Sequence, residues 1–133
     1  MARYAIDALT LLRLVDDGLA ADPAHQIVAP KSILVEGLDI LLDDVRNGRR
    51  KERDALRCHV RMTETRIRLL GDRVSRRTAW DLALEHGWAS VREAEYVAVA
   101  TLQADALVAS DPALASRAAG IVALATAEDL IAT

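Results

Sequence analysis

The sequence of 133 residues contains no phenylalanine, and aromatic residues make up only 3% of it. A core must therefore be filled by close packing of alanine, leucine and valine. So few aromatic rings also disfavour a base-stacking platform for single-stranded nucleic acid. The single cysteine, Cys58, cannot form an internal disulfide, and nothing else indicates an oxidising compartment, so we expect a cytoplasmic protein.

Long apolar runs are also missing. Asp7 and Arg13 interrupt the apolar N-terminal stretch, so the sequence predicts neither a signal peptide nor a membrane span. Hydrophobic residues nevertheless make up 52% of the chain and charged residues 28%, which excludes a disordered or low-complexity protein. The length suits one hydrophobic core, and we expect a single domain over residues 1–133.

Charge is unevenly distributed along the chain. Residues 46–77 hold twelve basic and four acidic side chains, a net charge of +8, which leaves −11 on the remainder. Such a segment attracts polyanions, so arginines that contact a phosphate backbone are one interpretation. An ordinary solvated, arginine-rich helix face is the other, and the sequence leaves both open.

Hydrophobic spacing predicts alternating strands and helices. Strands are expected at 3–6, 26–29, 105–110 and 120–125, and 66–70 is an ambiguous apolar run. Helices are expected at 8–18, 30–48, 51–64, 75–87, 90–103, 111–120 and 126–132. The second helix is expected to begin at Pro30, and the helix over 90–103 is apolar on nearly all sides and so predicted to be buried. This alternation predicts an α/β fold with a mainly parallel sheet covered by helices.

Asp7 and Asp111 each follow a predicted strand and begin a predicted helix. The simplest explanation of each is a helix N-cap, and Pro112 suits the first helical position after Asp111. Ligands of parallel sheets, however, bind beyond the carboxyl ends of the strands. Two carboxylates brought together there repel each other unless a cation or a proton lies between them.

Glu93 has two interpretations. It follows Ser90 by three residues, which is the spacing of a capping box. It also shares a helix face with Val97, Ala100 and Ala104, where a carboxylate is unfavourable unless it is paired, protonated or bound to a metal.

Glu36 shares a helix face with Asp39 and Asp43, and such like charges disfavour the helix unless a cation binds. We predict Glu36 as a candidate ligand and expect Asp39 and Asp43 to face solvent. Oxygen-only ligands suit Mg²⁺ or Mn²⁺. The histidines and the cysteine show no paired spacing for zinc or for nucleophilic catalysis, and no glycine-rich phosphate loop is present.

The order of these segments resembles the PIN-domain family, and specifically the VapC-type toxin ribonucleases of bacterial toxin–antitoxin pairs. The resemblance rests on YAIDALTLL, on APKSILVEGLDILL, on REAEYVAVATLQADALVASDPALA and on the terminal IVALATAEDL. It covers nearly the whole chain. It implies a three-layer PIN-like fold over residues 1–133, with a mainly parallel sheet of about five strands and helices on both faces.

By this resemblance, Asp7, Glu36, Glu93 and Asp111 form a catalytic, metal-binding pocket for Mg²⁺ or Mn²⁺. The implied activity is endonucleolytic cleavage of RNA by a metal-activated water, with arginines of residues 46–77 positioning the RNA backbone. The implied partners are an RNA substrate, a cognate antitoxin protein and a second copy of the chain in a homodimer, with no membrane.

The sequence departs from the family at three positions. Glu93 stands where the family usually has Asp, Leu9 stands where it usually has Ser, Thr or Asn, and Arg92 could pair with an acid. A PIN-like module with weakened catalysis that acts by binding protein or RNA is therefore the alternative. A receiver-like signalling module is a third hypothesis, but neither Lys31 nor Lys51 lies at the end of a late strand, where such modules need a lysine.

Overall fold

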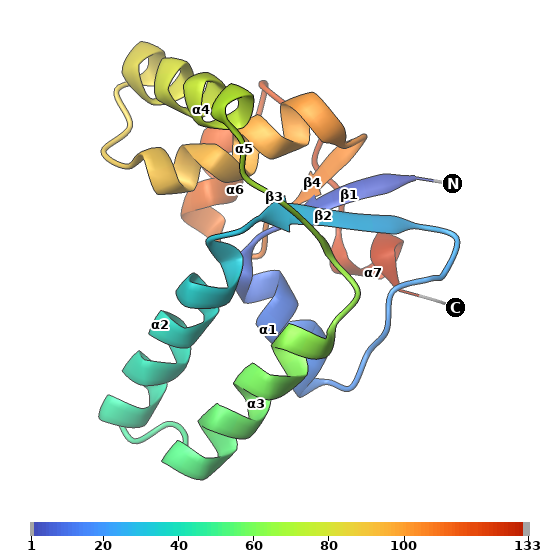
Figure 1. The fold of residues 1–133 in the computed structure, drawn as a ribbon, viewed down its shortest axis with the longest axis vertical. Coiled ribbons are helices and arrows are strands. Elements are labelled where there is room, and N and C mark those ends of the chain that lie inside the picture. The colour runs from blue at the N-terminus through green and yellow to red at the C-terminus, as the bar shows by residue number, and fades with distance from the viewer. Residues whose placement is uncertain (1, 132–133) are drawn as a thin grey trace.

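The computed structural model describes residues 2–131 as one parallel sheet between two groups of helices (Figure 1). The strands are β1 (Arg3–Ile6), β2 (Gln26–Pro30), β3 (Arg68–Leu70) and β4 (Ala106–Val108). The helices are α1 (Ala8–Asp16), α2 (Ile33–Arg46), α3 (Glu52–Glu64), α4 (Arg73–His86), α5 (Val91–Gln103), α6 (Pro112–Ala118) and α7 (Ala127–Leu130). The predicted α/β class with a parallel sheet covered by helices is confirmed.

The strand order is β3-β2-β1-β4, and every neighbouring pair is parallel. The chain moves from β1 outward to β2 and β3 and then returns to place β4 on the other side of β1. The order therefore reverses between β1 and β4, which is where open parallel sheets bind ligands. Asp7 and Asp111 follow these two strands.

The expectation of about five strands is wrong, because the described residues form a four-stranded sheet. The segment 120–125 contributes only an isolated bridge between Leu124 and Leu107. Its first residues cannot extend the pairing, since the amides of Ile121 and Val122 donate to the carbonyl of Ala118 in the turn after α6.

Several element boundaries differ from the prediction. Pro30 ends β2 instead of opening a helix, because it still pairs in register with Leu70 of β3 and α2 begins only at Ile33. The ambiguous run 66–70 contains β3. Helix α4 starts two residues early, because the Asp72 side chain accepts a hydrogen bond from the Ser75 amide in a capping box. The last helix covers 127–130, and residue 132 of its predicted range lies outside the described residues.

Aliphatic side chains fill the core, as the lack of phenylalanine requires. Helices α1, α2 and α3 pack together below the sheet in Figure 1, and α5 covers its other face with α4 outside it. Helix α5 is buried as predicted, from Tyr96 to Ala100. Helices α4 and α5 pack against each other through small side chains: Ala79, Ala83, Ala94 and Ala98. No helix among residues 2–131 has both the length and the apolar character needed to cross a membrane.

Candidate active site

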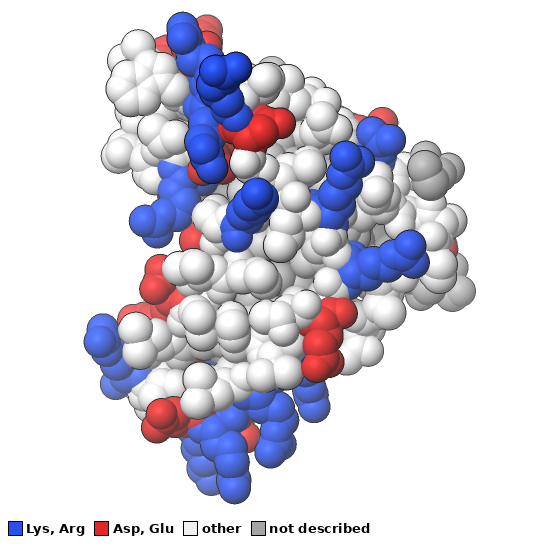
Figure 2. Space-filling view, viewed as in Figure 1, with Lys and Arg blue, Asp and Glu red and all other residues white. Residues whose placement is uncertain are grey.

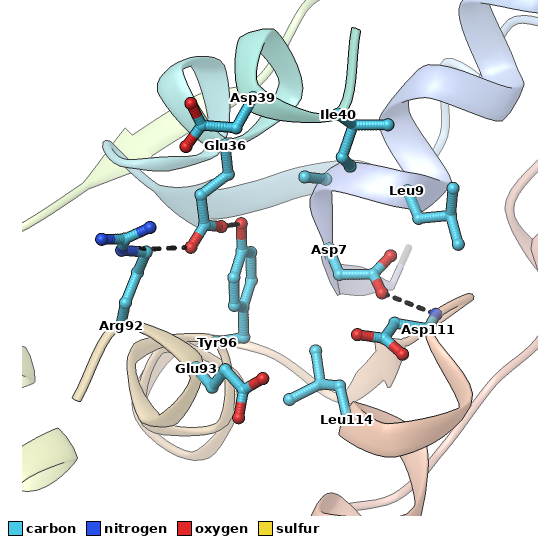
Figure 3. A pocket seen from close by; sticks show the side chains of 11 residues that line it. Asp7, Leu9, Glu36, Asp39, Ile40, Arg92, Glu93, Tyr96, Asp111 and Leu114 are labelled. Carbon is cyan, nitrogen blue, oxygen red and sulfur yellow. Dashed lines mark hydrogen bonds and ion pairs between the residues drawn. The ribbon is translucent and has the colours of Figure 1, made fainter. Parts of the chain in front are cut away.

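A cleft of about 400 Å³ opens at the carboxyl edge of the sheet, beside the ends of β1 and β4 (Figure 3). Its walls come from the start of α1, from α2, from the first turns of α5 and from α6. All four acids predicted from the sequence line this cleft: Asp7, Glu36, Glu93 and Asp111. Segments separated by up to 104 residues are thus brought to one place.

Asp7 is almost completely buried, with 3% of its surface exposed, and its carboxylate is held by hydrogen bonds. Oδ1 accepts from the amide of Thr10 at 2.9 Å and from the Thr10 hydroxyl at 2.5 Å. Oδ2 accepts from the amide of Asp111 at 2.9 Å. The N-cap prediction for Asp7 is therefore confirmed, and the same carboxylate also ties the end of β1 to the residue that follows β4.

Thr10 is fully buried and joins the two strand ends through its hydroxyl. Its Oγ1 lies 3.0 Å from the Val108 carbonyl oxygen and 2.7 Å from Ser110 Oγ, in addition to its contact with Asp7. A carboxylate oxygen has two lone pairs, so Asp7 Oδ1 is fully used by Thr10, whereas Oδ2 keeps one. Asp7 can therefore offer a further ligand only one oxygen.

Asp111 also acts as a helix cap, as predicted. Its Oδ1 accepts from the Ala113 amide at 3.0 Å, and Pro112 occupies the first turn of α6. Its other carboxylate oxygen accepts no hydrogen bond from the residues that the structure describes. Asp111 is half-buried and borders the cleft together with Asp7, so both carboxylates keep lone pairs available there.

Glu36 lies on the opposite wall of the cleft and contacts α5 (Figure 3). Its Oε2 accepts a hydrogen bond from the Tyr96 hydroxyl, and its Oε1 lies 3.7 Å from Nε of Arg92. Burial raises the pKa of Glu36 to about 7, although the positive charge of Arg92 acts in the other direction. Near neutral pH, this carboxyl is therefore partly protonated.

Glu93 makes an ion pair with Arg117 of α6. The capping-box interpretation of Glu93 is wrong, because its carboxylate is turned away to Arg117 while the Ser90 side chain accepts from the Arg92 amide. Glu93 is also less buried than its apolar helix face suggested, since 37% of its side chain is exposed. Partial exposure and a cationic partner together make this carboxylate tolerable without a metal.

The four carboxylates suit a hard divalent cation by their chemistry, because all of their donors are oxygens. Within residues 2–131, however, no group of three or more histidine, cysteine, aspartate or glutamate side chains is arranged to hold a metal ion. Asp7 and Asp111 form one pair, while Glu36 and Glu93 face arginines. Asp7 and Asp111 keep lone pairs open to the cleft, whereas Glu36 and Glu93 can join them around a cation only after their carboxylates leave Arg92 and Arg117.

The sequence also gave expectations for three neighbouring charged side chains. Arg92 does pair with an acid, as the sequence suggested, and its partner is Glu36. Asp39 is exposed but also borders the cleft, so the expectation that it faces solvent is only partly correct. Asp43 is exposed as predicted and pairs with Arg49 at 2.8 Å.

Sequence reasoning missed three side chains that hold the acids in place: Thr10, Tyr96 and Arg117. Thr10 follows Asp7 by three residues, a spacing at which a helix cap reaches its partner, so a local signal existed. Arg117 gave no signal, since it meets Glu93 only because α6 lies beside α5 in the fold.

Together the fold and the cleft define an α/β protein with a parallel sheet and an acidic cleft at the edge where its strand order reverses. No protein-family model and no curated protein matches this sequence. The chain is similar to a solved structure described as "Crystal structure of PAE2754 from Pyrobaculum aerophilum", with a TM-score of 0.71 and 21% identity. The match covers 96% of this chain and 92% of that one. At this identity the likeness concerns the fold alone.

Proposed function

We propose that this protein is a Mg²⁺- or Mn²⁺-dependent endoribonuclease of the PIN-like, VapC-type class and the toxin of a bacterial toxin–antitoxin pair. One observation carries the proposal: four acids from distant segments line one cleft at the point where the strand order reverses. A single buried or half-buried carboxylate is usually a helix cap or an ion-pair partner. Four of them around one cleft are typical of phosphoryl-transfer sites that use divalent cations.

In this proposal Asp7 and Asp111 hold the cation, and Glu36 and Glu93 join them when they leave Arg92 and Arg117. A bound divalent ion supplies an activated water and stabilises the charge that develops on the phosphate. Asp7 presents a single oxygen in a fixed direction, because Thr10 and the Asp111 amide hold its carboxylate. Arg92 places a positive charge on the wall of the cleft, where it can orient a phosphate oxygen of the substrate.

The test is cleavage of RNA by the purified protein. We expect cleavage with Mg²⁺ or Mn²⁺ and none in EDTA, and Asp111→Asn should abolish it while leaving the fold intact. Asp54→Asn is the matched control, because Asp54 is an exposed acid on α3 that does not border the cleft. Cleavage that persists in EDTA or in Asp111→Asn would refute the metal site.

The alternative is a PIN-like module that binds RNA or protein but has weak catalysis or none. The arginine partners of Glu36 and Glu93 favour it, since each guanidinium occupies a position where a cation could otherwise bind. Calorimetric titration with Mn²⁺ separates the two functions. Tight binding, accompanied by faster RNA cleavage in Glu93→Asp, supports the nuclease, and no heat at millimolar Mn²⁺ supports the binding module.

The proposal includes a cytoplasmic location, an antitoxin that covers the cleft and a homodimer, all of which follow from the resemblance. Growth arrest on expression, relieved by Asp111→Ala, tests the toxin role. Light scattering of the purified chain tests the dimer, and a monomer at micromolar concentration would remove that part of the proposal.

A further inference from the structure

The fold spreads the basic segment 46–77 over separate parts of the surface. Figure 2 shows one group at the far end of α2 and α3, at the bottom of the view, and another over α4 at the top. The α4 group continues toward the hollow between α5 and α2, where acidic side chains lie. The sequence left open whether this segment binds phosphates or is an ordinary solvated face, so the groups need to be judged apart.

Two arginines of the group at the end of α2 and α3 are paired with acids. Arg50 bonds Asp16 at 2.6 Å and Asp44 at 2.7 Å, and Arg49 pairs with Asp44 and with Asp43. This group is also remote, because Arg46 lies ten residues beyond Glu36 along α2, which is about 15 Å of helix. These arginines connect the turn after α2 to α1 and are poorly placed for a ligand at the cleft.

The outer face of α4 is different. Arg73, Arg76, Arg77, Trp80 and Leu84 recur at intervals of three and four residues, so they share one side of the helix. All five are exposed, Trp80 by 56% and Leu84 by 73%. Among the described residues, only Arg77 of these arginines has an ion-pair partner, the exposed Asp81.

This face is connected to the cleft through α5. The alanine contacts hold α4 against α5, and Gly87 turns the chain back with a φ of 68°. The end of α4 therefore lies next to the first turn of α5, which carries Arg92 and Glu93 into the cleft. A strand of RNA that leaves the cleft past Arg92 can reach the α4 face.

We infer that the α4 face formed by Arg73, Arg76, Arg77, Trp80 and Leu84 binds single-stranded RNA next to the cleft. The arginines contact phosphates, and the indole of Trp80 stacks on a base, which is how single strands are bound without sequence preference. Charge complementarity favours RNA over an apolar protein partner, since three arginines share the helix face of one large aromatic ring. The inference departs from the expectation that base stacking is disfavoured only at this single exposed indole. The inference rests on the proposed function for its substrate class.

The experiment is fluorescence anisotropy with a labelled, unstructured 20-nucleotide RNA in EDTA, so that binding is measured without cleavage. We expect Trp80→Ala to weaken binding about fivefold or more while the salt dependence stays unchanged. Trp80→Tyr should restore most of the affinity. Arg76→Ala should weaken binding and lower the slope of log K against log salt by about 0.7.

Matched controls lie on α3. Leu56→Ala removes an apolar side chain that is 54% exposed, and Arg53→Ala removes an exposed arginine. Both should bind within twofold of the wild type. Equal losses in Arg53→Ala and Arg76→Ala, or wild-type binding by Trp80→Ala and Arg76→Ala, would overturn the inference.

A separate cleavage assay distinguishes this inference from the proposed function. If the protein cuts RNA but the α4 variants bind it like the wild type, only the α4 surface is refuted. If α4 binds RNA as expected but no cleavage occurs with Mg²⁺ or Mn²⁺, only the nuclease is refuted. No RNA binding by the wild type refutes the α4 surface, whereas the metal titration still tests the cleft.

Discussion

Replacing Asp7 by asparagine should lower the free energy of unfolding, in addition to any effect on catalysis. The Asp7 carboxylate accepts three hydrogen bonds, from the amide and hydroxyl of Thr10 and from the amide of Asp111. Asparagine has one oxygen and one NH₂ group, so it can accept from only one of these two sides. Asparagine is as good an N-cap as aspartate, so we expect the oxygen to stay with Thr10.

The amide of Asp111 then faces the new NH₂ group, and two donors meet. A buried donor left without an acceptor costs about 1–3 kcal/mol. The hydrogen bonds kept by Thr10 also lose the carboxylate charge, which lowers their contribution by about 1 kcal/mol. The free energy of unfolding should therefore fall by about 2–4 kcal/mol in Asp7→Asn, a large part of the total stability of a small domain.

Urea denaturation followed by circular dichroism measures this change, and the matched control is Asp111→Asn. The Asp111 carboxylate accepts one amide hydrogen bond, from Ala113, and asparagine can still accept it. We expect a loss of less than about 1 kcal/mol there. The hydrogen-bond argument fails if the free energy of unfolding of Asp7→Asn lies within about 0.5 kcal/mol of the wild-type value. It also fails if this free energy is no lower than that of Asp111→Asn. Loss of cleavage in Asp7→Asn alone therefore cannot identify a metal ligand.

Three further predictions concern protonation, the arginine partner and the core. The folded protein raises the pKa of Glu36 from 4.5 to about 7, so protonation stabilises the fold fully below pH 4.5, and this stabilisation disappears as the pH rises through 7. Relative to Glu36→Gln, the free energy of unfolding of the wild type should fall by about 1–2 kcal/mol between these pH values, after allowance for solvent screening. Urea denaturation measures it, and the same pH dependence in both proteins would contradict the prediction. Arg117→Met should release Glu93 and tighten Mn²⁺ binding several-fold by calorimetry, with Arg53→Met unchanged as control; equal affinities would show that Glu93 is no ligand. Leu11 is fully buried, and Leu11→Ala should lower the free energy of unfolding by about 2–5 kcal/mol, while a loss below 1 kcal/mol would show that α1 is not packed as described.

Most of the fold could be predicted because its signals are local. Hydrophobic spacing placed the helices and three of the four strands, and caps at Asp7 and Asp111 marked two strand-to-helix junctions. The prediction failed where hydrogen bonding between neighbouring strands determines the structure. Pro30 stays in β2 because of its register with β3, and Leu124 forms only one bridge with β4.

The candidate site was predictable in its membership but not in its arrangement. Sequence patterns selected Asp7, Glu36, Glu93 and Asp111, and the fold brings all of them to one cleft. The sequence also suggested that Arg92 pairs with an acid, though not which one.

By itself, the sequence determined the class of fold, the junctions of strands and helices and the acids worth considering, since each depends on neighbours within a few positions. Only the tertiary structure decided that Asp7 is bound by the Asp111 amide, that Glu93 faces Arg117, and that Arg50 pairs with Asp16 far from the cleft. The physical reason is that hydrogen bonds and ion pairs depend on distances in space. Residues far apart in the chain come within bonding range only after the sheet and its helices have packed.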